Sequence, residues 1–108
     1  MNSELSVQAA YRVLADDRAR AVVTAVAETG GLSLDALARM LAAREQGVPP
    51  ERLDEQAVRN VRVSLRDDQL PCLAAHGILG LDGDAVTPGS NLGELVAAED
   101  AIQEALRN

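Results

Sequence analysis

Apolar residues recur at i, i+3, i+4 and i+7 along much of the chain, which is the spacing of helices with one buried face. A first short helix is predicted over residues 6–14, with Val7, Tyr11 and Leu14 on one side. Two longer helices follow, and their apolar stripes are Ala19, Val22, Val23 and Val26, then Leu34, Leu37, Ala38 and Leu41. The pattern therefore predicts a mainly helical protein.

Polar side chains and turn formers bound these helices. Asp16 or Asp17 can cap the second helix and Ser33 the third, because a side-chain oxygen can accept from backbone N–H groups that lack partners. Residues 47–53, with one glycine and two prolines, form a longer connection than the three- or four-residue turn of a minimal helix-turn-helix. This length favours a winged variant with an extended second helix.

The stretch that follows, residues 54–87, organises the chain. Asp54 is the expected cap of a helix whose inward positions are Val58, Val61 and Leu65. The adjacent face carries Arg59, Arg62, Arg66 and Gln69 at i, i+3, i+7 and i+10. A helix with a basic and amide stripe beside its buried face is suited to contact with a polar partner.

The apolar register of this helix shifts after Gln69, to Leu70, Leu73 and Ala74. Pro71 stands at the shift, and a proline ring clashes with the carbonyl four residues back and has no N–H to donate. We expect a kink or short break there. Gly77 is the expected left-handed stop.

A hairpin and a last helix complete the pattern. Two short strands, Ile78 to Leu81 and Ala85 to Thr87, flank the turn signal Asp82-Gly83. Asn91-x-x-Glu94 is a capping pair for a final helix. The apolar face of that helix is Leu92, Leu95, Val96, Ile102 and Leu106. The predicted fold is mainly α with a small β-hairpin wing: a winged helix-turn-helix domain over residues 1–90 and a C-terminal helix over residues 91–108.

Composition changes the picture of the core. The 108 residues suffice for one compact domain, and 47% of them are apolar, but there is no Phe, no Trp and a single Tyr. The core must therefore be built from Ala, Val, Leu and Ile. No apolar run approaches the roughly 20 residues that span a bilayer, and Met1-Asn2-Ser3-Glu4 has no secretory-signal pattern. We expect a cytoplasmic protein with no membrane partner.

The charge is acidic and unevenly distributed. All ten basic residues are Arg, and seventeen acidic residues give a net charge of −7. Such a surface is typical of halophilic proteins, because concentrated salt damps its repulsion; an ordinary acidic mesophile protein is the alternative. Residues 82–108 carry −5, which leaves −2 for residues 1–81. The acidity is thus concentrated away from the basic stripe.

Several segments carry a resemblance to a known family. They are LADDRARAV at 14–22, LSLDALA at 32–38, VRVSL at 61–65 and LPCLAAHGI at 70–78. They are similar to segments of the small haloarchaeal winged helix-turn-helix proteins of uncharacterised function, within the ArsR/MarR-like class. The resemblance covers roughly residues 10–87, and Leu-Pro-x-Leu-x-x-x-Gly is its most specific element. It implies a winged-helix fold, an archaeal source and a DNA-binding or regulatory role.

The stripe on the central helix is the candidate DNA-binding site. We expect a recognition helix around residues 55–69, with double-stranded DNA as partner, since Arg makes forked contacts to guanine edges and phosphates. The predicted contact residues are Arg59, Asn60, Arg62, Ser64, Arg66 and Gln69. The alternative is a solvated face held by an i,i+4 pair between Glu55 and Arg59.

Acidic residues near the stripe leave a second function open. Asp67 and Asp68 lie within the predicted recognition helix, and Asp82 and Asp84 lie at the wing tip, where a basic residue would help phosphate contact. These positions depart from the family's pattern. The alternative function is a protein–protein adaptor on a winged-helix frame that has lost its basic footprint.

Two further features have a functional and a structural interpretation. The final helix can form a homodimer seam through Leu92, Leu95, Val96, Ile102 and Leu106, or it can pack on its own domain. Arg18 and Arg20 can touch the DNA backbone or pair with surface carboxylates.

Enzymatic chemistry has little support in the sequence. There is no P-loop, no dinucleotide-binding glycine motif and no cluster of Cys and His. His76, the single histidine, is expected to end a helix, and Cys72, the single cysteine, to be a small buried hydrophobe, although a redox role stays open. We expect no enzyme activity, no cofactor, no metal and no small-molecule ligand.

Overall fold

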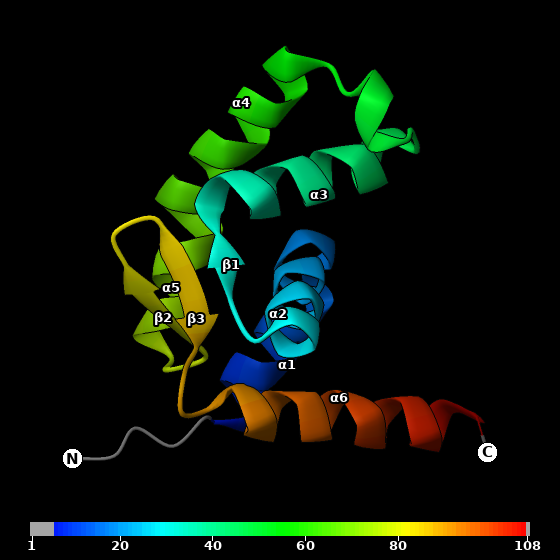
Figure 1. Ribbon diagram of the computed structural model, residues 1–108. Helices are drawn as coiled ribbons and strands as arrows, with labels where there is room; N and C mark the ends of the chain where they lie inside the picture. Colours follow the sequence, from blue (N-terminus) through cyan, green and yellow to red (C-terminus); the bar gives the residue numbers. More distant parts are fainter. Residues whose placement is uncertain (1–5, 108) are drawn as a thin grey trace.

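The computed structural model describes residues 6–107, and helices make up most of them (Figure 1). The elements in chain order are α1 Val7–Ala15, α2 Asp17–Thr29, β1 Leu32–Ser33, α3 Leu34–Gln46, η1 Pro50–Arg52, α4 Glu55–Ser64, η2 Leu65–Gln69, α5 Leu70–Ala75, β2 Leu79–Asp82, β3 Ala85–Pro88 and α6 Leu92–Arg107. Residues 1–4, where no secretory signal is expected, lie outside the described residues. Within residues 6–107, no helix combines the length and apolar character needed to cross a bilayer.

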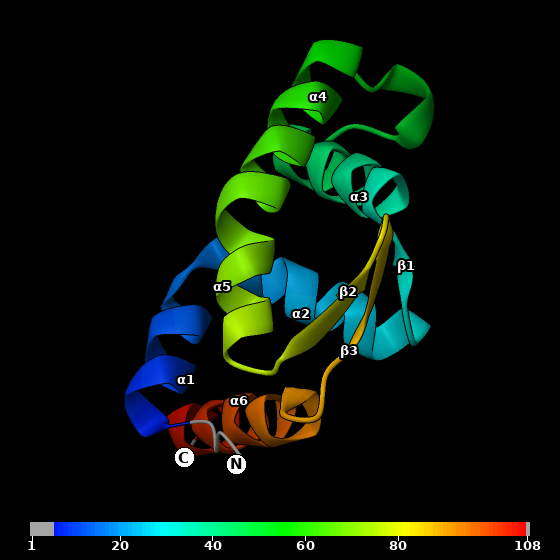
Figure 2. The same cartoon turned by 90° about the vertical axis from the view of Figure 1, so that its left-hand side faces the viewer.

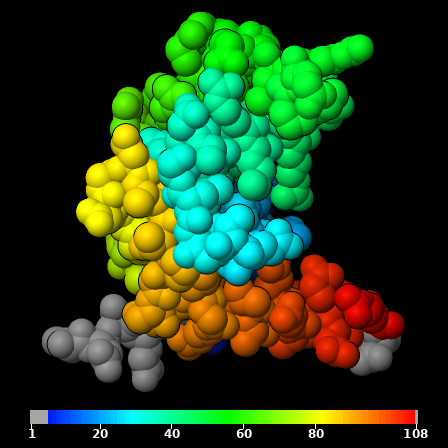
Figure 3. All heavy atoms as spheres, viewed as in Figure 1, coloured from blue at the N-terminus to red at the C-terminus, as the bar shows by residue number. Residues whose placement is uncertain are grey.

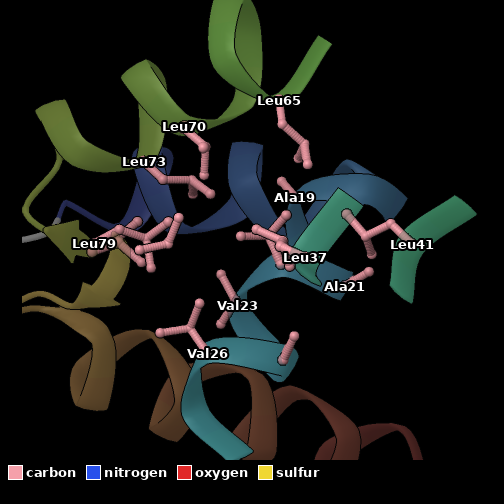
Figure 4. Packing of buried hydrophobic residues seen from close by; sticks show 14 of the residues in the cluster. Ala19, Ala21, Val23, Val26, Leu37, Leu41, Leu65, Leu70, Leu73 and Leu79 are labelled. Carbon is pink, nitrogen blue, oxygen red and sulfur yellow. The ribbon is translucent and has the colours of Figure 1, made fainter. Parts of the chain in front are cut away.

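The core forms around α2, which contacts α1, α3, α6 and β3. Val22 and Val26 of α2 are fully buried, and Leu37 of α3 and Leu65 lie in the same cluster (Figure 4). Every buried residue of this cluster is Ala, Val, Leu or Ile, as the composition requires. Because small aliphatic side chains fill the space, the helices approach one another closely without aromatic rings.

Side-chain caps begin the central helices at the predicted residues. The carboxylate of Asp16 accepts from the N–H groups of Arg18 and Ala19, at 3.0 and 3.1 Å. The Ser33 hydroxyl accepts from the α3 backbone at 3.0 Å, and the Asp54 carboxylate accepts from the α4 backbone at 3.0 Å. These three caps confirm the predicted starts of α2, α3 and α4.

The orientation predicted for the first helix is wrong. Val7 and Tyr11 are 70% and 59% exposed, whereas Ala9, Ala10 and Val13 of the same helix are buried. α1 packs against α2 and α6 through its small residues. Alanines allow close helix contact, and this contact outweighs the burial of the two larger side chains.

The central helix is continuous from α4 to α5, and its register changes in the π turn η2 (Figure 2). The Leu70 N–H donates to the Leu65 carbonyl, five residues back, which inserts one extra residue into the helix. Leu70 and Leu73 thereby return to the buried side, in line with Val58 and Val61. Of the kink or short break expected at Pro71, the break is absent: the helix continues, and the irregularity is a π turn directly before the proline, which widens the helix and absorbs the shift.

Three strands form one antiparallel sheet in the order β1-β3-β2. Asp82 pairs with Ala85 around a two-residue turn, and Gly83 in that turn has φ 59°, a conformation that favours glycine. Leu32 pairs with Val86, so the short strand β1 closes the hairpin onto the core. This third strand was not predicted, because two residues carry no readable alternation.

The order of elements defines the fold. A helix (α2), a short strand (β1), a helix (α3), the long helix α4–α5 and the hairpin β2–β3 constitute a winged helix-turn-helix. The helix α6 follows and lies along the base of the molecule, opposite α4 (Figures 1 and 2). The predicted fold class is confirmed.

Candidate nucleic-acid interface

The outward side of α4 carries four exposed side chains, which we call the α4 outer face: Gln56, Arg59, Asn60 and Val63. Their spacing is i, i+3, i+4 and i+7, so they share one side of the helix. Val58, Val61 and Leu65 on the other side are buried in the core. The core thus fixes α4 so that its outer face points to solvent.

Hydrogen bonds connect the polar members of the α4 outer face. Arg59 Nη2 donates to Gln56 Oε1 at 2.7 Å, and Gln56 Nε2 donates to Asn60 Oδ1 at 2.9 Å. Each side chain is therefore oriented by its neighbour on the helix surface. The remaining donors and acceptors of these groups face solvent and can bind a partner.

A second group of charged side chains joins α4 to α3, and we call it the α3–α4 charge network: Asp35, Arg39, Glu55 and Arg62. Arg39 donates two hydrogen bonds to Glu55, at 2.9 and 3.0 Å, and its Nε donates to Asp35 at 3.1 Å. Arg62 Nη2 donates to the other oxygen of Asp35. The network therefore neutralises Arg39 and Arg62 with two carboxylates.

These contacts shift the pKa values of three groups in the network. Hydrogen bonding from Arg39 lowers the pKa of Asp35, and it also lowers the pKa of Glu55. Hydrogen bonds to Glu55 and Asp35 raise the pKa of Arg39. Each of these three shifts favours the charged form of its group, as expected for ion pairs. The Nε of Arg62 is buried and has no acceptor among the described residues.

The predicted stripe does not lie on one face. Arg59 and Asn60 belong to the α4 outer face, while Arg62 points to Asp35 of α3. Arg66 is exposed beside Asp67, with its Nε 3.5 Å from the carboxylate. Ser64 donates to Gln69 at 3.0 Å, and Gln69 lines a groove of about 260 Å³ beside Arg12 and Val13 of α1.

The split of the stripe has two physical causes. Arg62 lies two residues after Asn60, about 200° around a regular helix, so it faces α3 instead of joining the α4 outer face. Beyond Leu65, the extra residue of η2 rotates the helix, so Arg66 and Gln69 no longer follow the regular α spacing. Two members of the α4 outer face, Gln56 and Val63, were missed. They could have been found from the i, i+3, i+4, i+7 relation to Arg59 and Asn60, on the side opposite Val58. Glu55 binds Arg39, so the expected Glu55–Arg59 pair is replaced by a contact between helices.

The wing lies beside the start of α3. The Leu34 N–H donates to the Asp84 carbonyl at 2.7 Å, which joins the wing turn to the first residue of α3. Residues 79–88 contain Asp82 and Asp84 and no basic residue. The wing tip is therefore negatively charged.

The positions predicted for a dimer seam divide along α6. Leu92 and Leu95 are buried in the core of their own chain, and Val96 packs against that core. Ile102 is half-buried, and Leu106 is 77% exposed. Only the distal part of α6 thus offers apolar surface to another molecule.

Arg18 and Arg20 lie away from the α4 outer face. Arg18 donates two hydrogen bonds to Glu45, at 2.8 and 2.7 Å, and Arg20 donates to Glu99 at 3.3 Å. The contact with Glu45 raises the pKa of Arg18. Both arginines line a hollow of about 370 Å³ between α2, α3 and α6, visible in Figure 3 between α3 and α6. Pairing with surface carboxylates is therefore the observed role of both arginines.

The single cysteine and the single histidine both lie on or next to α5. Cys72 is exposed, so the prediction of a buried cysteine is wrong: Leu70 and Leu73 take the inward positions, and Cys72 falls between them on the outer side. His76 is the C-terminal cap residue of α5, as predicted. In residues 6–107, no three side chains of His, Cys, Asp or Glu come together as metal ligands.

Comparison with known proteins places the chain in a family. One family model matches residues 11–87 and is described as Domain of unknown function (DUF7344). The chain belongs to the DUF7344 family. The DUF7344 match runs from α1 into β3, so it contains α2, β1, α3 and the α4–α5 helix, and α6 lies beyond it. Neither the curated proteins nor the solved structures include a match to the chain.

Proposed function

We propose that this DUF7344 protein is a DNA-binding transcriptional regulator whose recognition helix is α4. The observation that carries the proposal is the α4 outer face, where a winged helix-turn-helix presents an arginine and two carboxamides together. In proteins of this architecture a helix enters the major groove while adjoining elements contact the backbone. The wing would lie along the backbone next to α4.

The side chains of the α4 outer face suit the edges of bases. Arg59 can donate a fork to guanine, Gln56 and Asn60 can each bond adenine through both amide atoms, and Val63 can contact a thymine methyl group. These contacts distinguish base pairs, whereas contacts to phosphates do not. The face therefore supports sequence-specific binding over binding of any duplex.

The charge around α4 suggests that DNA affinity depends only weakly on contacts to phosphates. Residues 55–69 carry three arginines and three acidic residues, and the wing adds Asp82 and Asp84. Few arginine side chains are thus free to contact phosphates and displace the counterions of DNA. The Kd for DNA should therefore change little with salt concentration. This property suits a high-salt cytoplasm. We accordingly propose a halophilic, archaeal and cytoplasmic setting, which the acidic composition and the haloarchaeal resemblance support.

We also propose that the protein acts as a homodimer through the distal half of α6. Leu106 is the most exposed large apolar residue of those described, and Ile102 lies one turn before it. A two-fold dimer would present two copies of α4 to two half-sites.

A protein–protein adaptor is the second candidate function, and the acidic wing favours it. Asp82 and Asp84 would repel phosphates but would suit a basic segment of a protein partner. The two candidates differ in what the α4 outer face binds, and this can be measured directly.

The test is selection of binding sequences from a random duplex library in 1 M KCl, followed by titration of the selected duplex. Arg59→Ala with Asn60→Ala should raise Kd at least roughly tenfold and relax the sequence preference. Arg44→Ala is the matched control, because Arg44 is an exposed arginine of α3 that lines the hollow and not the α4 outer face. Equal binding by both variants would exclude α4 as the reading element. If no sequence were enriched, the adaptor function would be favoured.

A further inference from the structure

Asp35 lies where α4, α3 and the wing meet. It belongs to the first turn of α3, one residue after Leu34, which is hydrogen-bonded to the wing turn. Its side chain is 54% exposed, and its two oxygens accept from Arg39 and Arg62 respectively. A carboxylate on this surface therefore already occupies one donor group of Arg62, Nη2.

This position has the properties of a phosphate site. The first turn of a helix favours an anion, because its N–H groups and the helix dipole are positive there. Two guanidinium groups from different helices converge on the same point, and arginine binds phosphate and carboxylate with the same geometry. In the free protein, the anion in this position is part of the chain itself.

We propose that Asp35 occupies the place of a DNA phosphate on Arg62, so that duplex binding exchanges this carboxylate for a backbone phosphate. The inference rests on the proposed function. Asp35 acts as an internal competitor, because every duplex must displace it from Arg62. Only a duplex that also binds the α4 outer face gains enough binding free energy to offset the loss of that ion pair. Asp35 is thus a determinant of specificity without touching a base.

The contacts of the α3–α4 charge network allow Arg62 to separate from Asp35. Its Nε has no acceptor in the paired state, and an unsatisfied buried donor makes that state less favourable. When Arg62 leaves, Asp35 keeps its hydrogen bond from Arg39. Arg39 in turn remains bound to Glu55 by two hydrogen bonds, so α3 and α4 stay joined during the exchange.

Glu55 provides a matched control. It has the same charge, belongs to the same network and bonds Arg39, and its hydrogen-bonding partner among the described residues is not Arg62. Asp35→Asn and Glu55→Gln each remove one negative charge from this surface. Only the first of them also removes the charged partner of Arg62 and leaves it a neutral amide.

The experiment measures Kd for the selected duplex and for an unrelated duplex between 0.1 and 1 M KCl, after circular dichroism has established that each variant is folded. Asp35→Asn should bind the unrelated duplex up to about fivefold more tightly at the lowest salt, the upper end of the range for one exposed ion pair. The slope of log Kd against log salt should steepen by about 0.9, the value for one added phosphate contact. Glu55→Gln should leave that slope unchanged.

Two results would overturn the inference while leaving the proposed function intact. One is an equal gain for Asp35→Asn and Glu55→Gln, which would reflect net charge alone. The other is persistence of the gain in an Arg62→Ala background, where no exchange is possible. If wild type and both variants bound no duplex, the proposed function itself would fail.

Discussion

Arg39 is the residue on which the α3–α4 charge network depends, because it binds one carboxylate from each helix. A lysine could not take its place, since a single ammonium lacks the fork that bonds both oxygens of Glu55 while Nε reaches Asp35. The groups are exposed, so each pair alone contributes little to stability. Their effect lies in geometry: they hold α4 against α3 both at its first residue, Glu55, and two turns later, at Arg62.

The network predicts acid sensitivity. The pKa values of Asp35 and Glu55 are lower in the folded chain than in the unfolded chain, so the unfolded chain binds more protons in acid. The free energy of unfolding should stay level near neutral pH and fall once the pH drops through about 4, the ordinary range of these groups. Thermal unfolding between pH 7 and pH 3 measures the fall. It should be shallower in the variant Asp35→Asn with Glu55→Gln.

Glu104→Gln, at the exposed end of α6, controls for the loss of a carboxyl group outside the network. Superimposable pH profiles for wild type and the double variant would show that these two carboxylates do not contribute to acid unfolding.

The helix from α4 to α5 shows what a single inserted residue does to an element. Without η2, Leu70 and Leu73 would turn away from the core, because five residues overshoot one helical turn. With η2, one buried side continues from Val58 to Leu73. The same turn separates the α4 outer face from the groove beside α1, which Gln69 lines.

This role of η2 predicts that a one-residue deletion in it changes the free energy of unfolding little, whereas a one-residue insertion lowers it strongly. Removing Asp68 together with Pro71→Ala should give a regular α-helix with an unbroken apolar side, and unfolding free energy should change by about 1 kcal/mol or less. Inserting one alanine after Asp68 should rotate Leu70 and Leu73 out of the core and cost at least about 3 kcal/mol. Urea unfolding measures both. A deletion as damaging as the insertion would mean that η2 itself is needed for packing.

Elements were predictable from sequence where local chemistry decides them. Asp16, Ser33 and Asp54 mark helix starts through their own side-chain oxygens, and the shift after Gln69 signals a real irregularity. The sequence could not distinguish a break from an extra residue at that point. β1 was missed because Leu32 and Ser33 become a strand only through pairing with β3, more than fifty residues later.

The candidate site was predictable in part for the same reason. Arg59 and Asn60 follow from helical spacing within α4, which is local. The partner of Arg62 is Asp35, twenty-seven residues earlier, and no spacing rule connects them. The face of α1 was misjudged because its contact with α2 and α6 favours alanines over Val7 and Tyr11.

At the scale of the whole molecule, net charge opposes folding. The chain carries −7, and like charges on a small compact domain repel more strongly than in the expanded chain. Ion pairs between helices, such as Arg18 with Glu45, act in the other direction. Because the net charge is large, we expect repulsion to prevail.

Stability should therefore increase with salt. Raising KCl from about 0.1 to 1 M shortens the screening length from about 10 to 3 Å. Tm should rise by about 4–8 °C, which corresponds to about 1 kcal/mol for a domain of this size. Thermal unfolding followed by circular dichroism over this range measures the change, with sucrose as a control for non-ionic effects. A Tm that fell with added KCl would show that the ion pairs outweigh the repulsion.

The chain leaving the wing is bound to the end of α5 at three points. The Gly89 N–H donates to the Ile78 carbonyl and the Asn91 N–H to the Gly77 carbonyl, both at 2.8 Å, and the Asn91 side chain donates to the His76 carbonyl at 2.9 Å. A side chain on Gly89 would collide with the Gly77 backbone, so the backbone at Gly89 lies directly against the backbone at Gly77. The start of α6 and the end of α5 consequently share one backbone junction. A protein fused to α6 or docked on it would therefore keep a fixed orientation relative to any molecule bound at α4.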